Sequence, residues 1–365
     1  MSVRSPVLPV LLLALASLVL PLPAVAAASD VAVLLPQKGR LARVAQTVRD
    51  GLLAAYYQDS SSGADRVRLR FYDSSDGDVA SLLKEVVANG ADAVIGPLDR
   101  EQVQLLLTDP AGPPVPVIAL NRADGGRPGL YQLALAPEDE VSALVEWMRG
   151  NGVRQPLLLV AGGDEAGLRQ LRLFEQVWRA GGGDAPALLT LDTAAKGGVV
   201  AGIKPVAMRA GRHDGLFLAS PALARQILPA LTYFQSRLRL YSLSQAWEPQ
   251  SDASGQRDLN GLLFCGLPWL LDEPRPEQQA LYEAQPRPDA SHDRLYALGA
   301  DAWSVLRALR RLHEGEQLAL RTGRLHLNDH GHLIRHPTCA EVRHGTATIV
   351  QDAGRPARTA TRDGS

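Results

Sequence analysis

The chain of 365 residues is poor in lysine, cysteine and aromatic side chains. It has four lysines against 34 arginines, two cysteines, 5% aromatic residues and a net charge of −1. A nucleic-acid-binding surface requires a basic excess or a basic stripe, so this balance argues against nucleic acid as a partner. We interpret the rarity of lysine as a bias of the genome. The length suggests two domains or lobes, each able to bury its own core.

Motifs of the common catalytic classes are also lacking. The sequence contains no G-x-S-x-G, H-E-x-x-H, Walker A or G-x-G-x-x-G pattern. The glycine runs at 162–163 and 181–183 do not have the spacing of a phosphate-binding loop, and we interpret them as turns. The sequence therefore predicts a protein that is not an enzyme and that binds no cofactor.

Five of the eight histidines fall late in the chain, at His326, His330, His332, His336 and His344. Their spacing is compatible with metal binding in principle. In the hairpin expected there, however, the arms separate His326 from His332, and no Cys-x2-Cys or adjacent carboxylate pair completes a ligand set. We therefore expect solvated histidines and no metal site.

The N-terminus has the pattern of a secretory signal peptide. Arg4 precedes an apolar run at 7–20, and an alanine-rich A-x-A segment follows, so residues 1–26 are expected to be removed after Ala26. An uncleaved anchor helix is the alternative, but Pro21 and Pro23 would break it. With no cysteine near this site and no later apolar span, we expect an exported periplasmic protein without a membrane anchor.

The two cysteines, Cys265 and Cys339, lie far apart in the sequence. In an oxidising compartment such a pair can form a disulfide, and two separate buried thiols are the alternative. The sequence leaves both open.

Short apolar runs alternate with segments of helical periodicity over residues 31–243. Strands are expected at 31–35, 67–72, 93–95, 115–120, 157–160, 187–191, 216–219 and 238–243, and helices at 40–58, 79–88, 99–107, 137–148, 165–180, 198–209 and 222–234. Alternation of this kind predicts α/β architecture with helices on both faces of a parallel sheet. Two successive rounds predict two doubly wound lobes with a central cleft.

The last third of the sequence has a different rhythm. It predicts a strand at 259–264, an irregular connection at 272–293, a helix at 294–313, and a hairpin with arms at 322–327 and 332–335. Trp303 shares the apolar face of that helix, so it is expected to pack in the core. Residues 351–365 are polar and aperiodic and are expected to be a disordered tail.

Candidate binding residues follow the predicted strands, because ligands of open parallel sheets lie beyond the carboxyl ends of strands. They are Lys38, Gly39, Arg40, Asp73, Gly96, Pro97, Asp99, Asn121 and Arg122 in the first lobe, and Asp164, Ser220 and Ser244 in the second. Turn and capping chemistry explains any one of them without a ligand. As a set they predict a ligand cleft between the lobes.

Several segments resemble a known family. The strand ending at Leu34–Pro36, with segments 39–42 and 48–56, resembles the opening of type I periplasmic binding-protein folds. Segments 95–98, 116–121, 133–140, 258–262, 268–271, 298–303 and 322–325 resemble the LppC/LpoA family of penicillin-binding protein activators. The contexts of Trp269 and Trp303 favour this family over branched-chain amino-acid-binding proteins.

The resemblance implies two lobes joined by three crossovers, near Leu135–Pro137, Ser242–Trp247 and Gly315–Leu320. The first lobe would then comprise 30–135 plus 246–315, and the second 136–245 plus 316–350. Well-known members are lipoproteins with an N-terminal helical-repeat domain, and this sequence departs from both features.

The resemblance further implies a non-enzymatic regulator of peptidoglycan synthesis that contacts a class A penicillin-binding protein, with Trp269 as a candidate contact. The alternative is a periplasmic solute-binding protein for an ABC transporter or sensor. Pro97 has no N–H and Leu98 no polar group, at a turn where solute binders place hydroxyls, which favours the regulator. A charged ligand steered by Lys38, Arg40 or Arg122 belongs to the alternative.

Overall fold

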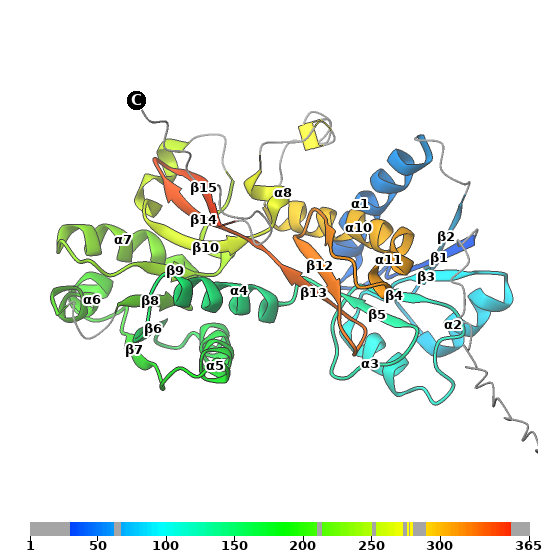
Figure 1. The fold of residues 1–365 in the computed structure, drawn as a ribbon, viewed down its shortest axis with the longest axis horizontal. Helices are drawn as coiled ribbons and strands as arrows, with labels where there is room; N and C mark the ends of the chain where they lie inside the picture. The colour runs from blue at the N-terminus through cyan, green and yellow to red at the C-terminus, as the bar shows by residue number, and fades with distance from the viewer. Residues whose placement is uncertain are drawn as a thin grey trace, which may run out of the picture.

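The computed structural model describes residues 30–61, 67–209, 214–249, 253–272, 276, 278–279 and 290–351. Two α/β lobes lie side by side along the long axis (Figure 1), which confirms the predicted fold class. The predicted signal peptide and residues 352–365 of the predicted tail lie outside the described residues. Within the described ranges, no helix combines the length and apolarity that a membrane crossing needs.

The first lobe is built on an eight-stranded sheet with the order β11-β12-β13-β5-β4-β3-β1-β2. Its strands are β1 (Asp30–Leu35), β2 (Arg68–Asp73), β3 (Ala93–Ile95), β4 (Val117–Ala119), β5 (Leu130–Leu133), β11 (Leu318–Ala319), β12 (Arg324–Leu327) and β13 (His332–His336). Its helices are α1 (Ala42–Ser61), α2 (Val79–Ala88), α3 (Arg100–Thr108), α10 (Ala290–Arg307) and α11 (Leu309–His313). β13 joins the parallel part beside β5, whereas β11 and β12 are antiparallel.

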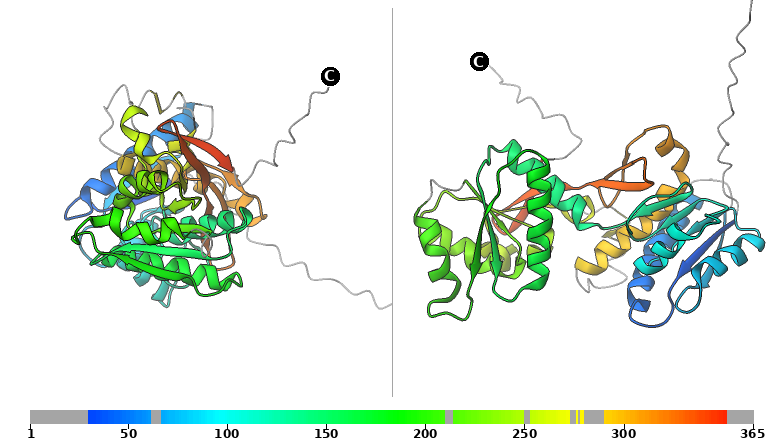
Figure 2. Two further views of the ribbon diagram at one scale, coloured as in Figure 1. Left: turned by 90° about the vertical axis from the view of Figure 1, so that its left-hand side faces the viewer. Right: turned by 90° about the horizontal axis from the view of Figure 1, so that it is seen from below.

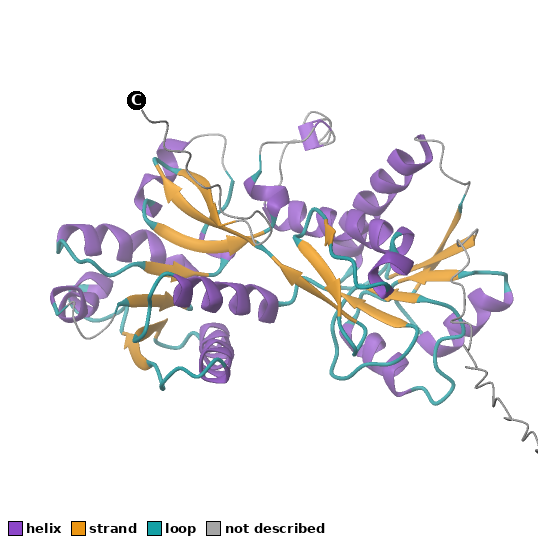
Figure 3. Cartoon of the chain, in the orientation of Figure 1, coloured by secondary structure: helices purple, strands orange, loops and turns teal. Residues whose placement is uncertain are grey.

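The second lobe is built on a seven-stranded sheet with the order β15-β14-β10-β9-β8-β6-β7. Figure 3 shows helices packed beside the strands in both lobes. Its strands are β6 (Pro156–Ala161), β7 (Ala187–Leu191), β8 (Gly215–Leu218), β9 (Leu240–Ser242), β10 (Leu262–Gly266), β14 (Thr338–Arg343) and β15 (Thr346–Gln351). Its helices are α4 (Pro137–Gly150), α5 (Glu165–Ala180), α6 (Gly198–Met208), α7 (Ala224–Tyr233) and α8 (Pro268–Leu271), with short 3-10 turns at Pro221–Leu223, Ser244–Ala246 and Ala253–Leu259.

Local sequence accounts for the regular elements. Residues 31–35 of β1 are all buried, as expected for a central parallel strand covered on both faces. The helix α2 begins at Asp78, whose carboxylate accepts hydrogen bonds from the backbone N–H groups of Ala80 and Ser81. It ends at Asn89, which is followed by Gly90 with φ +91°.

Two segments lie in a different sheet from the one expected. β10 pairs with β9 in the second sheet, although 246–315 was assigned to the first lobe. β11, β12 and β13 lie in the first sheet, although 316–350 was assigned to the second. The physical reason is that tertiary contact decides which of the two sheets each late strand joins, and the local pattern of these strands does not fix that choice.

The chain crosses between the lobes at three places. The right-hand view of Figure 2 shows the two lobes beside each other. The first crossing joins β5 to α4, at 134–136. The second lies between β10 and α10 rather than at Ser242–Trp247, and the third lies at Pro337, between β13 and β14, rather than at Gly315–Leu320.

Two glycines let α1 and α10 pack backbone to backbone in the first lobe. A Cβ atom on Gly51 would lie 2.0 Å from the carbonyl oxygen of Tyr296, and one on Gly299 would lie 1.9 Å from that of Val48. Trp303 on α10 is 2% exposed and meets Tyr56 edge to face at 5.2 Å. Its expected packing role is confirmed.

The cysteines are joined. Cys265 on β10 and Cys339 on β14 are paired in register on adjacent antiparallel strands and form a disulfide. The sequence left open a disulfide or two separate thiols, and the structure has the disulfide. It links the late strand β14 to β10 in the second sheet.

Candidate functional site

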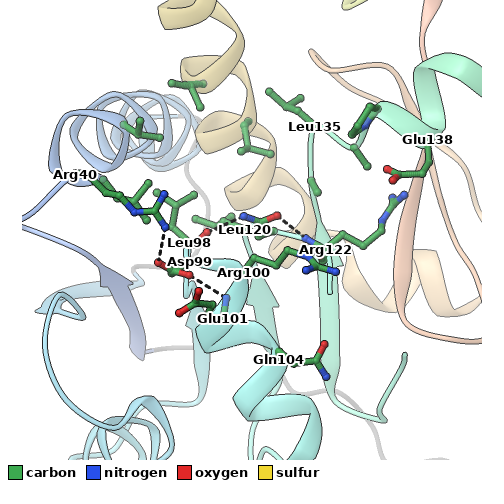
Figure 4. A pocket seen from close by; sticks show the side chains of 18 residues that line it. Arg40, Leu98, Asp99, Arg100, Glu101, Gln104, Leu120, Arg122, Leu135 and Glu138 are labelled. Carbon is green, nitrogen blue, oxygen red and sulfur yellow. Dashed lines mark hydrogen bonds and ion pairs between the residues drawn. The ribbon is translucent and has the colours of Figure 1, made fainter. Parts of the chain in front are cut away.

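A pocket of about 680 Å³ opens at the carboxyl end of the first sheet (Figure 4). Its floor is apolar and its rim is charged. The lining residues are Arg40, Leu41, Val44, Leu98, Asp99, Arg100, Glu101, Gln104, Leu120, Asn121, Arg122, Ala134, Leu135, Ala136, Pro137, Glu138, Leu295 and Leu298. The second-lobe candidates Asp164, Ser220 and Ser244 do not line it, so the predicted residues of the two lobes do not meet in this pocket.

Lys38 and Asp73 lie beside this pocket at the ends of β1 and β2. The ammonium group of Lys38 is 3.8 Å from the Asp73 carboxylate, which also accepts hydrogen bonds from the backbone N–H groups of Gln37 and Ser75, both at 2.9 Å. The Ser75 hydroxyl donates to the same oxygen. This hydrogen bond, the two backbone donors and Lys38 lower the pKa of Asp73 to about 2. Asp73 is therefore a fixed carboxylate that orders the loop after β1.

Arg40 and Asp99 face each other across one side of the pocket (Figure 4), with a nitrogen–oxygen distance of 3.8 Å. Asp99 also caps α3, because its carboxylate accepts the backbone N–H of Glu101 at 2.9 Å. Arg40 is 80% exposed at the side chain, so this pair stabilises the fold little.

Gly39, Gly96 and Pro97 shape the backbone beside the pocket. Gly96 has φ +107°, and a Cβ atom there would lie 2.1 Å from the carbonyl oxygen of Leu34, so only glycine fits. The carbonyl oxygen of Pro97 accepts the backbone N–H of Leu120 at 2.9 Å. Gly39 has φ +74° in the turn before α1. These three residues determine the course of the backbone beside the pocket and contribute no side-chain hydrogen-bond donor.

Asn121 and Arg122 follow β4, and their side chains form hydrogen bonds with other groups of the protein. The amide of Asn121 donates to the carbonyl oxygen of Leu98 at 3.1 Å. The guanidinium of Arg122 donates two hydrogen bonds to the carboxylate of Asp139, at 2.8 and 3.0 Å, and one to the carbonyl oxygen of Leu333 at 3.2 Å. This bidentate pair is nearly buried, with side-chain exposures of 14% and 3%.

Asp139 belongs to a buried ionic cluster at the start of α4. The backbone N–H of Arg335 donates to Asp139 at 3.2 Å, and the guanidinium of Arg335 donates to the carbonyl oxygen of Ala136 at 3.3 Å. Arg335 comes from β13, two residues before the third crossing. Burial lowers the pKa of Arg335, and the carboxylates of Asp139 and Glu140 oppose that change.

Glu140 connects the same helix end to the turn after β9 and, through Ser244, to α10 of the first lobe. Its carboxylate accepts hydrogen bonds from the backbone N–H and the hydroxyl of Ser244, and the carbonyl oxygen of Ser244 accepts from Arg294 at 3.3 Å. Burial raises the pKa of Glu140, while Ser244, Arg335 and Arg294 act in the opposite direction. The cluster thus joins β4, β13 and α10 of the first lobe to α4 and the turn after β9.

The remaining second-lobe candidates bind each other. The Ser220 hydroxyl donates to the Asp164 carboxylate at 2.6 Å and accepts the backbone N–H of Ala161 at 2.9 Å. Asp164 caps α5 through the N–H of Gly167 at 2.8 Å. The Ser220 hydroxyl, above all, lowers the pKa of Asp164. Turn and capping chemistry accounts for this pair.

Trp269 was expected at a protein-contact surface, and this expectation is wrong for the side chain itself. It is 1% exposed, it stacks on Tyr296 with ring centroids 5.8 Å apart, and the Arg321 guanidinium lies 6.0 Å from its ring. The short helix α8 directs the indole into the hydrophobic cluster that also contains Phe264 and Tyr296.

The late histidines that the structure describes form no ligand cluster. His326 and His336 face each other across the β12–β13 hairpin, with ring nitrogens 3.1 Å apart. His332 contacts the carbonyl oxygen of Gly125 at 2.9 Å. Over the described ranges, no three histidine, cysteine or carboxylate side chains are arranged to hold a metal ion.

Sequence reasoning missed Asp139, Glu140, Arg294 and Arg335 as members of the site. The acidic residues at the start of α4 are a visible signal, since carboxylates are favoured at helix N-termini. Nothing in the local pattern points to their arginine partners.

Comparison with known protein families identifies the family of this chain. The family model described as "LppC putative lipoprotein" matches residues 14–345. The chain belongs to the LppC family. Among curated proteins it is similar to the penicillin-binding protein activator LpoA of Pectobacterium parmentieri, with 26% identity over 349 residues that cover 84% of this chain and 51% of the relative. The LpoA of Haemophilus influenzae is 25% identical over 337 residues, covering 88% and 55%. This LppC chain spans about half the length of the curated relatives it matches.

Solved structures agree on the fold of this LppC protein. The C-domain of Haemophilus influenzae LpoA, described as a regulator of PBP1A, superposes with a TM-score of 0.74 at 24% identity, covering 88% of this chain and all of that domain. A protein of Chromobacterium violaceum, described as a putative branched-chain amino acid ABC transporter, superposes with a TM-score of 0.70 at 29% identity, covering 86% and 99%. Both the activator domain and a transport protein therefore share the two-lobe architecture.

Proposed function

We propose that this protein is a non-enzymatic periplasmic regulator of peptidoglycan synthesis that acts by contact with a class A penicillin-binding protein. The family relation supports the class, since the curated relatives named above are penicillin-binding protein activators. The observation that carries the proposal is that several residues predicted from the sequence to bind a ligand are held by other side chains of the protein. Arg122 is held by Asp139, Ser220 by Asp164, and Ser244 by Glu140.

A solute-binding protein must leave donors and acceptors open for its ligand, and it must also close its lobes around the ligand. The cluster of Arg122, Asp139, Glu140, Ser244 and Arg335 stands where the lobes join, so a large rotation of the lobes would break its hydrogen bonds. These contacts favour a scaffold of fixed shape that presents a surface to a partner.

The experiment is a binding measurement between the purified mature chain and a purified class A penicillin-binding protein, by sedimentation or by an immobilised-partner assay. We expect saturable binding that does not need any added small molecule. Absence of binding at micromolar concentrations of both proteins would contradict the proposal.

The second candidate is capture of a small solute, which the pocket of about 680 Å³ and the similarity to the Chromobacterium violaceum protein support. A melting-temperature screen against amino acids, short peptides and peptidoglycan fragments separates the two. A dose-dependent rise with one compound, lost in Arg40→Ala, would establish solute binding, because a ligand of the native state raises its stability by mass action.

A further inference from the structure

The segment that contains α6 and α7 carries a marked positive charge. Between Thr193 and Trp247 the sequence has seven lysines and arginines and a single acidic residue, Asp214, whereas the whole chain has a net charge of −1. The Asp214 carboxylate accepts the backbone N–H groups of Arg154 and Gln155, at 2.7 and 3.0 Å. The one carboxylate of this segment is therefore already hydrogen-bonded to the backbone just before β6.

Three of these cations lie on or beside α6 and form no ion pair within the described residues. Lys196, Lys204 and Arg209 are exposed, and no carboxylate of the described residues forms an ion pair with any of them. Arg225, in contrast, lies 3.5 Å from Asp258, and Arg239 donates to the carbonyl oxygen of Asn151 at 2.8 Å. Arg237, which follows α7, is exposed as well and forms no ion pair within the described residues, so the free charges lie beside both α6 and α7.

Large apolar side chains are exposed on the same two helices. Met208 is 65% exposed, Tyr233 on α7 is 79% exposed, and Val200 is 45% exposed. Val200, Lys204 and Met208 are spaced by four residues, so they share one face of α6. Lys204 is the sole charged residue of this helix, and a helix with so few polar residues is ordinarily covered.

The position of the helices leaves this face accessible. Figure 1 shows α6 and α7 at the end of the second lobe that points away from the first lobe. Ile203 and Ile227 pack in the hydrophobic cluster that contains Leu216 and Leu218 of β8. The opposite faces of the two helices therefore point outward. A flat surface can approach this end of the molecule without meeting the first lobe.

We propose that the outer face of α6 and α7, which we name the α6–α7 surface, docks on an anionic lipid membrane. Lysine and arginine side chains are attracted to acidic headgroups, while methionine, valine and tyrosine side chains enter the boundary between headgroups and acyl chains. The three cations have no partner that holds them in one geometry, so they suit mobile lipid phosphates better than the fixed carboxylates of a protein. This docking is independent of the first-lobe pocket.

The test is co-sedimentation of the full chain with vesicles of phosphatidylcholine alone and of phosphatidylcholine mixed with phosphatidylglycerol. Binding is expected only to the vesicles that contain phosphatidylglycerol, and it should be lost at high salt, because screening shortens the range of the attraction. No binding to those vesicles at low salt would overturn the proposal.

Paired variants test the surface itself. Lys204→Glu with Arg209→Glu should weaken binding by at least about fivefold per removed cation, whereas Lys84→Glu on α2 of the first lobe should leave it unchanged. Met208→Ser with Tyr233→Ser should also weaken binding, and Leu105→Ser, an exposed leucine on α3, should not. The melting temperature of each variant verifies that it folds.

Two results would contradict the proposal. An equal loss in Lys84→Glu would mean that total charge alone drives vesicle binding. Binding of the unmodified protein to an acidic protein surface through Lys204 and Arg209, with no affinity for the vesicles, would assign the surface to a protein partner. Neither result bears on solution binding to a penicillin-binding protein, so failure here is distinguishable from failure of the proposed function.

Discussion

Replacing Asp139 with alanine should destabilise the protein by about 3–5 kcal/mol, the usual loss when one partner of a buried ion pair is removed. The side chain of Asp139 is 3% exposed and accepts two hydrogen bonds from Arg122 and one from the backbone of Arg335. Without it, the guanidinium of Arg122 keeps a charge that is 14% exposed and has lost its counterion. Arg335 loses a compensating carboxylate as well.

The assay is urea unfolding at neutral pH, with thermal unfolding as a second probe. A loss of 3–5 kcal/mol corresponds to a fall in melting temperature of about 4–7 °C for a protein of this size. The matched control is Asp124→Ala, because Asp124 pairs with Arg100 at 3.1 Å while its side chain is 93% exposed. Such a surface pair contributes at most about 1 kcal/mol. An unchanged midpoint for Asp139→Ala, or equal losses in both variants, would refute the reasoning.

Three further outcomes are expected. Gly299→Ala should lower stability by about 3 kcal/mol, because its Cβ would meet the carbonyl oxygen of Val48 at 1.9 Å, while Gly150→Ala at an open helical position should not; equal melting temperatures would count against the close packing of α1 and α10. Cys265→Ser with Cys339→Ser should cost about 2–4 kcal/mol, measured by urea unfolding without reductant, and no loss would show that the bridge does not constrain the unfolded chain. The folded pKa of Asp73, about 2, lies below its unfolded value of 3.8, so its stabilisation is present above pH 4 and is lost as the pH falls toward 2. Asp73→Asn should therefore flatten the acid limb of the stability profile between those values, and an identical limb would contradict this assignment.

The sequence predicts the central elements well because their apolar pattern is local. The helix at 165–180 and the strand at 187–191 coincide with α5 and β7. The strand β5 was missed because it has four residues and contains Gln132, which is fully buried. Its amide is satisfied by the backbone of Ala123 and Gly125, which no local pattern reveals.

The sequence predicted the position of several strand-end residues beside a pocket, but it did not predict their hydrogen-bond partners. Loops after parallel strands do form the pocket rim, as the strand pattern implies. The partner of Arg122, however, is Asp139 on α4, the first helix of the second lobe. Arg335, which also binds Asp139, lies on β13 near the end of the chain. Such pairings depend on which sheet the late strands join, so they follow from the tertiary fold alone.

The most direct test of the central claim is the rate of glycan polymerisation and cross-linking by a purified class A penicillin-binding protein at increasing concentrations of this chain. The account predicts a saturable change in that rate, with no small molecule added and with no rate in the absence of the penicillin-binding protein. An unchanged rate at saturating concentrations, together with a melting temperature that rises with one amino acid, would contradict it.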